Sequence, residues 1–194
     1  MSRPVAVAIT GGIGAGKSEA LAAFARHGAA VLSSDEVVHR LLRDDPQVRE
    51  AIVAELGSEA LDGEGRIDRA AVGRLVFGDP KRTAWLEGLL HPRVVRENVA
   101  WRERLAALPD PPRVCVTEVP LLYEVGGESR FDAVVVITAP LDVRAGRTPH
   151  ATDERAARLL PDDEKLARAD FAYVNDGSLE ELDAFVAGVL ERLA

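Results

Sequence analysis

Eight consecutive residues near the N-terminus, Gly11–Ser18, have the types and spacing needed to hold a chain of phosphates. They match the pattern G-x-x-x-x-G-K-[ST] in full. Glycines let the backbone turn its N–H groups inward around a phosphate, a lysine reaches the β- and γ-phosphates, and the hydroxyl binds Mg²⁺. The alternative is a glycine-rich turn with a surface lysine. We expect a nucleoside triphosphate to contact Gly12, Ile13, Gly14, Ala15, Gly16, Lys17 and Ser18, with Ser18 also a ligand of Mg²⁺.

Two acidic residues follow or end predicted strands, at the edge where a parallel sheet binds ligands. Asp35 is expected to face the phosphate-binding loop, where it would orient or deprotonate an attacking hydroxyl or hold a Mg²⁺ water. Its alternative role is a helix N-cap. Glu118 is either an outer-shell group near the metal or a member of a structural ion pair.

Short, continuously apolar runs predict a parallel sheet that is covered by helices on both faces. The class is α/β, a P-loop fold with a five-stranded parallel sheet, and its order of strands is left open. The predicted strands are Val5–Thr10, Ala30–Leu32, Val114–Thr117, Ala133–Thr138 and Ala172–Val174.

Helical spacing dominates between the second and third strands. Asp45 and Asp68 are predicted N-caps, and Gly78-Asp79-Pro80 is predicted to be a turn. Pro92 is predicted to open a long helix that ends near Leu108. Other helices are expected from Lys17 to His27-Gly28, from Asp35 to Leu42, and from a capping box at Ser178 and Glu181, with Leu179, Leu182, Val186, Val189, Leu190 and Leu193 along one side.

The whole chain, 1–194, is predicted to be one kinase-like domain with two additions to its core. The core comprises about 1–34, 113–140 and 170–194. A helical insertion occupies about 35–108, and a short segment of about 141–169 lies before the last strand.

Composition excludes several classes of protein. The net charge of −8 argues against a general nucleic-acid or acidic-lipid surface. No apolar run is long enough to cross a bilayer, the N-terminus lacks the layout of a signal peptide, and Cys115 is the single cysteine. We therefore expect a cytoplasmic protein that binds neither nucleic acid nor membrane, and Cys115 is expected to be a buried apolar residue. Arginine dominates the cations, and the only lysines are Lys17, Lys81 and Lys165.

Five motifs, the first of which contains the loop, resemble the dephospho-coenzyme A kinase family over nearly the whole chain. They are TGGIGAGKS (10–18), VLSSDEVVH (31–39), LLHPRV (89–94), VPLLYE (119–124) and DDEKLARADFAYVNDGSLEEL (162–182). The resemblance implies transfer of the ATP γ-phosphoryl group to the 3′-hydroxyl of dephospho-CoA, with Mg²⁺ as cofactor. For the oligomeric state we expect a monomer or a weak homo-oligomer.

The resemblance also implies roles for residues outside the loop. Asp35 would be the acceptor-side carboxylate, although Ser33 stands where the family often has a second acid. Acceptor-binding candidates are His91, Arg93, Pro120, Leu121, Leu122, Tyr123 and Glu124, with Arg96 one helical turn after Arg93. For these residues the alternatives are a turn at His91, solvated arginines, and a core cluster at 120–124. Asn175 would lie beside the nucleobase or form a plain turn.

Arginines between 141 and 169 fall in the region that resembles the family's lid. Arg155 aligns with a lid arginine and is the predicted catalytic cation; Arg144, Arg147 and Arg158 are further candidates, or exposed helix residues. Thr148–Asp153 is shorter than the family's pattern, and Leu159 stands where glutamine is common.

Two other functions remain open alongside this one. Another small-metabolite or nucleoside kinase would share the loop. A nucleotide-sensing switch would share it too, although the guanine-reading N-K-x-D pattern is missing from the sequence.

Overall fold

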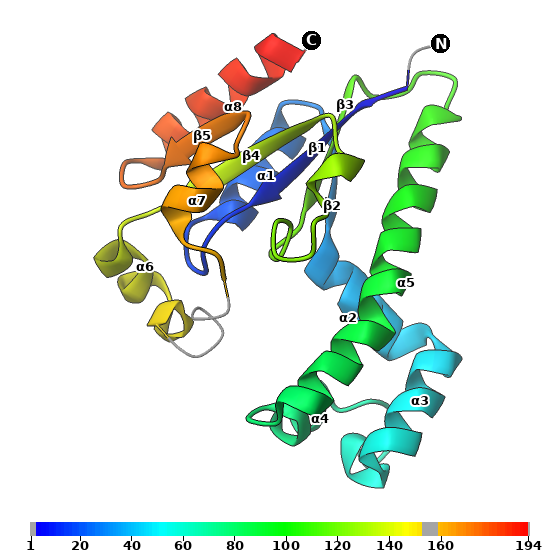
Figure 1. Cartoon of the computed structure of the whole chain (residues 1–194). Coiled ribbons are helices and arrows are strands. Elements are labelled where there is room, and N and C mark those ends of the chain that lie inside the picture. The colour runs from blue at the N-terminus through cyan, green and yellow to red at the C-terminus, as the bar shows by residue number, and fades with distance from the viewer. Residues whose placement is uncertain (1–2, 153–158, 194) are drawn as a thin grey trace. The chain divides into compact units, whose positions relative to one another are not determined.

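A computed structural model describes residues 3–152 and 159–193 (Figure 1). The chain divides into two compact units, each considered by itself. The first contains the described residues of Met1–Ser33 and Trp101–Ala194, and the second is Ser34–Ala100.

The first unit is built on a five-stranded parallel sheet of order β2-β3-β1-β4-β5. All neighbours pair in parallel, as predicted, and β1 occupies the centre between β3 and β4. The segment after β1 therefore leaves from the middle of the carboxyl edge, the position at which such sheets bind ligands. The strands are β1 (Val5–Thr10), β2 (Ala30–Ser33), β3 (Val114–Glu118), β4 (Ala133–Thr138) and β5 (Phe171–Val174).

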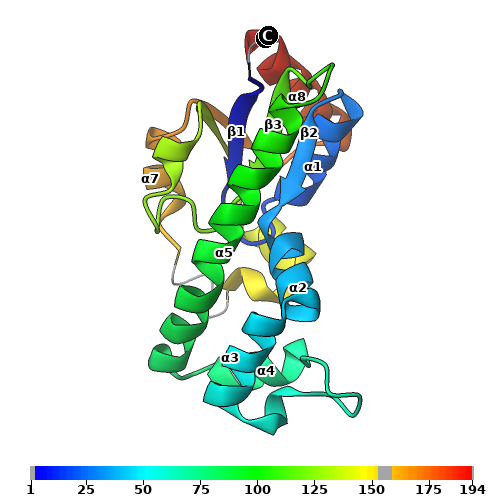
Figure 2. The same cartoon turned by 90° about the vertical axis from the view of Figure 1, so that its right-hand side faces the viewer.

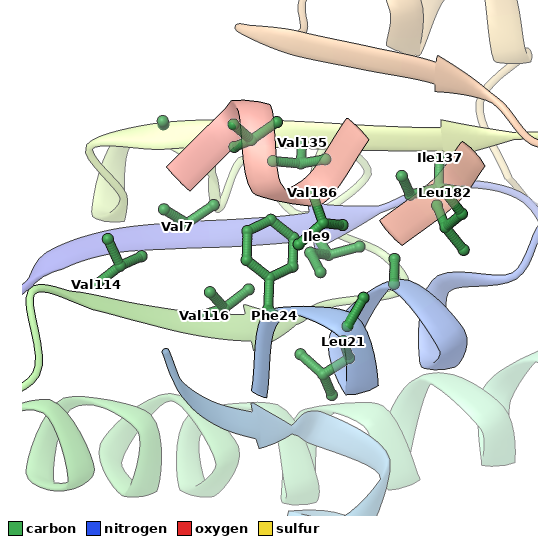
Figure 3. Packing of buried hydrophobic residues seen from close by; sticks show 14 of the residues in the cluster. Val7, Ile9, Leu21, Phe24, Val114, Val116, Val135, Ile137, Leu182 and Val186 are labelled. Carbon is green, nitrogen blue, oxygen red and sulfur yellow. The ribbon is translucent and has the colours of Figure 1, made fainter. Parts of the chain in front are cut away.

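One face of the sheet carries a wholly apolar core against α1 (Lys17–Arg26) and α8 (Leu179–Leu193). Phe24 of α1 is fully buried, and its ring lies among Val7, Ile9 and Val186 (Figure 3). Burial of one such ring contributes about 1.5–3 kcal/mol. This core fixes the start of α1, and with it the loop that precedes the helix.

The other face mixes apolar packing with charges. Leu122 and Tyr123 pack there against β1 and β4, and segments further along the chain add Leu160 and Leu166. The Arg168 guanidinium lies 4.2 Å from the centre of the Tyr123 ring. This face is covered by α7 (Asp162–Ala167), on the opposite side of β1 from α1 (Figure 2). Helices on both faces confirm the predicted class.

The second unit is helical, as predicted. It comprises α2 (Ser34–Asp44), α3 (Pro46–Leu56), a 3₁₀ turn at Ser58–Ala60, α4 (Arg69–Val76) and most of α5 (Pro80–Ala106). Both predicted N-caps are confirmed: Asp45 accepts from the N–H groups of Gln47 and Val48, and Asp68 from those of Ala70 and Ala71. The first unit adds α6 (Leu141–Arg147) and 3₁₀ turns at Glu128–Arg130 and Pro149–Thr152.

The prediction that Pro92 opens the long helix is wrong. The helix begins directly after a cap at Asp79, whose carboxylate accepts from the N–H groups of Lys81 and Arg82, and Pro92 lies in its interior. Either Pro80 or Pro92 could occupy the first turn of this helix. The helix starts at Pro80 because the aspartate before it supplies an N-cap.

The capping box of α8 is confirmed, but one residue of its apolar side is not packed. Ser178 N–H donates to Glu181 Oε2 and Glu181 N–H to Ser178 Oγ, at 2.8 and 3.2 Å. Leu179 is 61% exposed, because it stands at the first helical position, before the buried side of the helix begins at Leu182. Among the described helices, none combines the length and apolar composition that crossing a membrane requires.

Candidate active site

The loop after β1 has the backbone shape that its glycines predict. Gly11 and Gly16 adopt φ of +143° and +97°, which L side chains rarely take. A β-carbon at Gly11 would collide with the carbonyl of Ile137, and one at Gly16 with the side-chain amide of Asn175. Both positions therefore need glycine for conformation and for space.

Lys17 and Ser18 begin α1 at the end of this loop. The Lys17 ammonium donates to the carbonyl oxygen of Gly12 at 2.9 Å, so the side chain bends back over the loop. Ser18 is exposed in the first turn, where the helix dipole favours anions. Cation, hydroxyl and amide-rich backbone together can hold a polyphosphate.

Two residues distant in sequence hold the loop from outside. Asn175 is 4% exposed, and its side-chain Nδ2 donates to the carbonyl of Ala15 at 2.8 Å. The backbone N–H of Asn175 donates to the carbonyl of Thr138 at 2.7 Å. Arg147 donates to the carbonyls of Gly14, Ala15 and Asn175 at 3.2–3.4 Å. Asn175 thus fastens the loop to the end of β4, a role that the alternative of a plain turn did not include.

Arg144 also lies against the loop. A β-carbon at Gly12 would collide with Arg144 Nη1, and Arg144 Nη2 lies 3.2 Å from Asp162 Oδ2. The Arg144 side chain is only 15% exposed. Arg144 and Arg147 therefore come to the loop from one helix, α6. Arg155 and Arg158 lie outside the described residues.

The carboxyl edge beside the loop carries an acidic side chain. Glu118 ends β3 opposite Ile9 of β1 and Ser33 of β2, and it is 7% exposed. Its neighbour along the chain, Val119, donates its N–H to the Ile9 carbonyl at 2.9 Å. The structure thus places a buried carboxylate near the residues that lead into the loop.

The segment predicted to bind the acceptor splits into core and polar parts. Leu122 and Tyr123 are 0% and 5% exposed and belong to the apolar cluster on the face of the sheet that α7 covers. Burial also raises the pKa of the Tyr123 phenol. Pro120 and Leu121 are half-buried. Glu124 Oε1 accepts from the N–H of Leu160 at 2.9 Å and lies 3.0 Å from Lys165 Nζ.

The remaining candidates lie in the second unit. Asp35 is the second residue of α2, within its first turn rather than before it, and its side chain is exposed. His91 and Arg93 lie on α5, where the Arg93 guanidinium donates to the Leu89 carbonyl at 2.7 Å and lies 3.8 Å from Asp45. Arg96 is an exposed residue of the same helix.

Sequence reasoning gave no role to Lys165 or Asp162. Lys165 is completely buried, although it follows three acidic residues that look like a solvated helix start. A signal was available: in a chain with three lysines, Lys17 and Lys165 both stand inside sequence motifs. Lysine is almost never fully buried without a charged partner, and Glu124 is that partner.

Comparison with known proteins decides the family. A family model described as dephospho-CoA kinase matches residues 5–181. The chain belongs to the dephospho-CoA kinase family. Among individual members, the dephospho-CoA kinase of Anaeromyxobacter dehalogenans is 40% identical over 197 residues, covering 96% of this chain and 89% of that protein. The Frankia casuarinae enzyme is 36% identical, covering 96% and 82%.

Solved structures extend the likeness to three dimensions. A Thermus thermophilus crystal structure aligns over 100% of both chains with a TM-score of 0.77 and 35% identity. Shikimate kinase from Aquifex aeolicus aligns over 97% of both chains with a TM-score of 0.54 and 15% identity, which shows a shared fold. The P-loop kinase fold is thus common to enzymes with different acceptors, and the dephospho-CoA kinase family is only one of the families that have it.

Proposed function

We propose that this chain transfers the γ-phosphoryl group of ATP to the 3′-hydroxyl of dephospho-CoA, the last step in making coenzyme A. The single observation that carries this proposal is the family match over residues 5–181. The loop by itself supports only nucleotide binding, because shikimate kinase has the same fold and its name states a different acceptor.

Charge stabilisation and positioning are the main work that this reaction asks of a protein. Lys17, now bonded to the Gly12 carbonyl, would exchange that oxygen for phosphate oxygens of ATP. Backbone N–H groups of the loop and the start of α1 would add further donors. Arg155 would supply the lid cation, a role that its alignment with the family supports.

Asp35 would act on the acceptor side. Its carboxylate would orient the attacking 3′-hydroxyl or take its proton. The exposed side chain in the first turn of α2 supports a role toward a ligand, since it leaves the carboxylate accessible. His91, Arg93 and the half-buried Pro120 and Leu121 would contact the rest of dephospho-CoA.

Magnesium fits the oxygen donors near the loop. Ser18 offers an exposed hydroxyl at the start of α1 and Glu118 a carboxylate at the end of β3. Mg²⁺ prefers oxygen ligands and is held in kinases by few protein groups together with substrate phosphates and waters. When bound, the ion would neutralise charge on the transferred phosphoryl group. We further infer a cytoplasmic monomer or weak homo-oligomer, which the single cysteine and net charge of −8 support.

A panel of acceptors tests the proposal. The purified protein is mixed with ATP and Mg²⁺, and ADP is followed with dephospho-CoA, shikimate, gluconate or a nucleoside in separate reactions. We expect dephospho-CoA to be the only acceptor of this panel that raises ADP release above background. Equal stimulation by another acceptor would reassign the substrate, and slow ADP release that no acceptor changes would indicate a nucleotide switch.

A further inference from the structure

A buried ion pair links the segment after β3 to α7. Lys165, the fourth residue of α7, is 0% exposed, and its ammonium lies 3.0 Å from Oε1 of Glu124, whose side chain is 13% exposed. Within residues 3–152 and 159–193, Lys165 Nζ makes no hydrogen bond of normal geometry, so its attraction to Glu124 is mainly one of charge. Charges buried in this way depend on each other, because neither has water to replace a lost partner.

The same carboxylate oxygen holds the backbone that leads into α7. Glu124 Oε1 accepts from the N–H of Leu160 at 2.9 Å, and the Leu160 side chain packs into the core beside Leu122 and Tyr123. Glu124 therefore fixes two points of one segment, Leu160 by its backbone and Lys165 by its side chain. Between these points lies the start of α7 (Figure 1).

The start of α7 in turn contacts Arg144, the residue of α6 that lies against the phosphate-binding loop. Asp162, its first residue, lies 3.2 Å from Arg144 Nη2, and Arg144 Nη1 occupies the space directly over Gly12. Asp162 Oδ1 itself lies close enough to Gly12 to touch a β-carbon there, at 3.4 Å. A continuous set of contacts thus runs from Glu124 through α7 and Arg144 to the loop.

We propose that Glu124 is a positioning residue for nucleotide binding, acting with Lys165, rather than a group that contacts the acceptor. The pair holds α7 so that Asp162 keeps Arg144 at the loop. The part of this proposal that concerns the acceptor rests on the proposed function, because it is tested by kinetics with dephospho-CoA. The part that concerns ATP affinity does not, because that affinity is measured without an acceptor.

The test is a double-mutant cycle of Glu124→Gln and Lys165→Met. Glutamine keeps an oxygen for the Leu160 N–H and removes the charge, while methionine keeps the length of the lysine stem. Each single variant leaves one buried charge alone, so we expect its ATP dissociation constant, measured by calorimetry with Mg²⁺, to rise about tenfold or more. The double variant buries no lone charge, so its loss of ATP affinity should be smaller than the product of the two single losses.

Acceptor kinetics separate the two roles of Glu124. If Glu124 positions α7, KM for dephospho-CoA stays within about twofold in all three variants while KM for ATP follows the calorimetry. A raised KM for dephospho-CoA in the double variant would overturn the proposal, since a carboxylate that contacts the acceptor is missing there whatever happens to Lys165. Unchanged ATP affinity in both single variants would overturn it as well.

Matched variants control for folding and for charge. Glu164→Gln makes the same chemical change on the exposed side of α7 and should leave ATP affinity as it is. Asp162→Asn should weaken ATP binding while Asp163→Asn, its exposed neighbour, should not. If a single variant does not fold, the KM of the double variant for dephospho-CoA still shows whether Glu124 contacts the acceptor. Failure of wild type to phosphorylate dephospho-CoA would refute the proposed function and leave the calorimetric cycle valid.

Discussion

The two compact units hold their candidate functional residues in different ways. In the first, the loop is fixed by groups far away in sequence: Asn175 Nδ2 bonds to the carbonyl of Ala15, 160 residues earlier. In the second, Arg93 bonds to the carbonyl of Leu89, one helical turn away on the same helix. The loop is thus shaped by contacts across the first unit, whereas Asp35, His91 and Arg93, the acceptor candidates of the second unit, lie on helices. Changes at the loop should therefore disturb ATP binding, and changes in the helical unit should leave it intact.

The largest effect is expected at Lys17. Lys17→Ala removes the one side-chain cation within the loop sequence, and we expect kcat/KM to fall by about 10³-fold or more while the fold survives. Lys81→Ala, which removes an exposed lysine of the helical unit, should keep full activity. Steady-state kinetics together with circular dichroism measure both variants. Near-normal turnover by Lys17→Ala would contradict the role of the loop.

Asp35→Asn should separate chemistry from nucleotide binding. Removing a group that orients or deprotonates the acceptor hydroxyl lowers kcat by about 10²–10⁴-fold, and ATP affinity should change little. Glu36→Gln makes the same kind of change at the next position of the same helix, to which no acceptor role is assigned, so its kcat should fall far less than that of Asp35→Asn. An unchanged kcat in Asp35→Asn would contradict the acceptor-side role.

Two glycines with positive φ give a paired test of the units. Gly16→Ala and Gly57→Ala both impose a backbone strain of about 1–3 kcal/mol, at φ of +97° and +80°. An added β-carbon at Gly16 also collides with Asn175, whereas nothing lies within 4 Å at Gly57. We expect both variants to lose thermal stability and only Gly16→Ala to lose ATP affinity, by about tenfold or more. Comparable ATP affinity in the two variants would remove the contrast between the units.

The smallest effect concerns pH and lies away from the loop. Asp132 has a pKa lowered to about 2, chiefly by its hydrogen bonds from Arg3, with the Ala6 N–H adding to the shift. A lowered pKa means that the ionised group stabilises the fold above its unfolded pKa near 3.8, and that this contribution disappears as pH falls toward 2. Asp132→Asn should therefore cost stability at pH 7, by less than about 1 kcal/mol because the pair is partly exposed. Urea unfolding from pH 7 to pH 2 should show the two proteins converging; a constant difference would contradict this assignment.

The sheet was predictable because its strands are short apolar runs with clear ends. Ala133–Thr138 was predicted to the residue, and the N-caps at Asp45 and Asp68 follow from local chemistry alone. The order of the strands was not predictable, since it depends on crossovers between distant segments. The start of the long helix was misplaced because two prolines compete, and the cap at Asp79 was taken for part of a turn.

The loop was predictable in the same local sense, and the groups around it were not. Gly11–Ser18 carries its pattern within eight consecutive residues. The contacts of Asn175 with Ala15, of Arg144 with Gly12 and of Lys165 with Glu124 join residues separated by 41 or more positions, and no local pattern encodes such distances. The rarity of lysine in this chain was the one sequence feature that set Lys165 apart.

The most direct test of the account identifies the product. Purified protein is incubated with Mg²⁺, dephospho-CoA and ATP labelled in the γ-phosphoryl group, and the acceptor is recovered for mass spectrometry and phosphorus NMR. The account predicts that one labelled phosphoryl group appears on the 3′-oxygen of the ribose, at a rate that Lys17→Ala abolishes. Label that appears only in free phosphate, or on another atom of the acceptor, would contradict it.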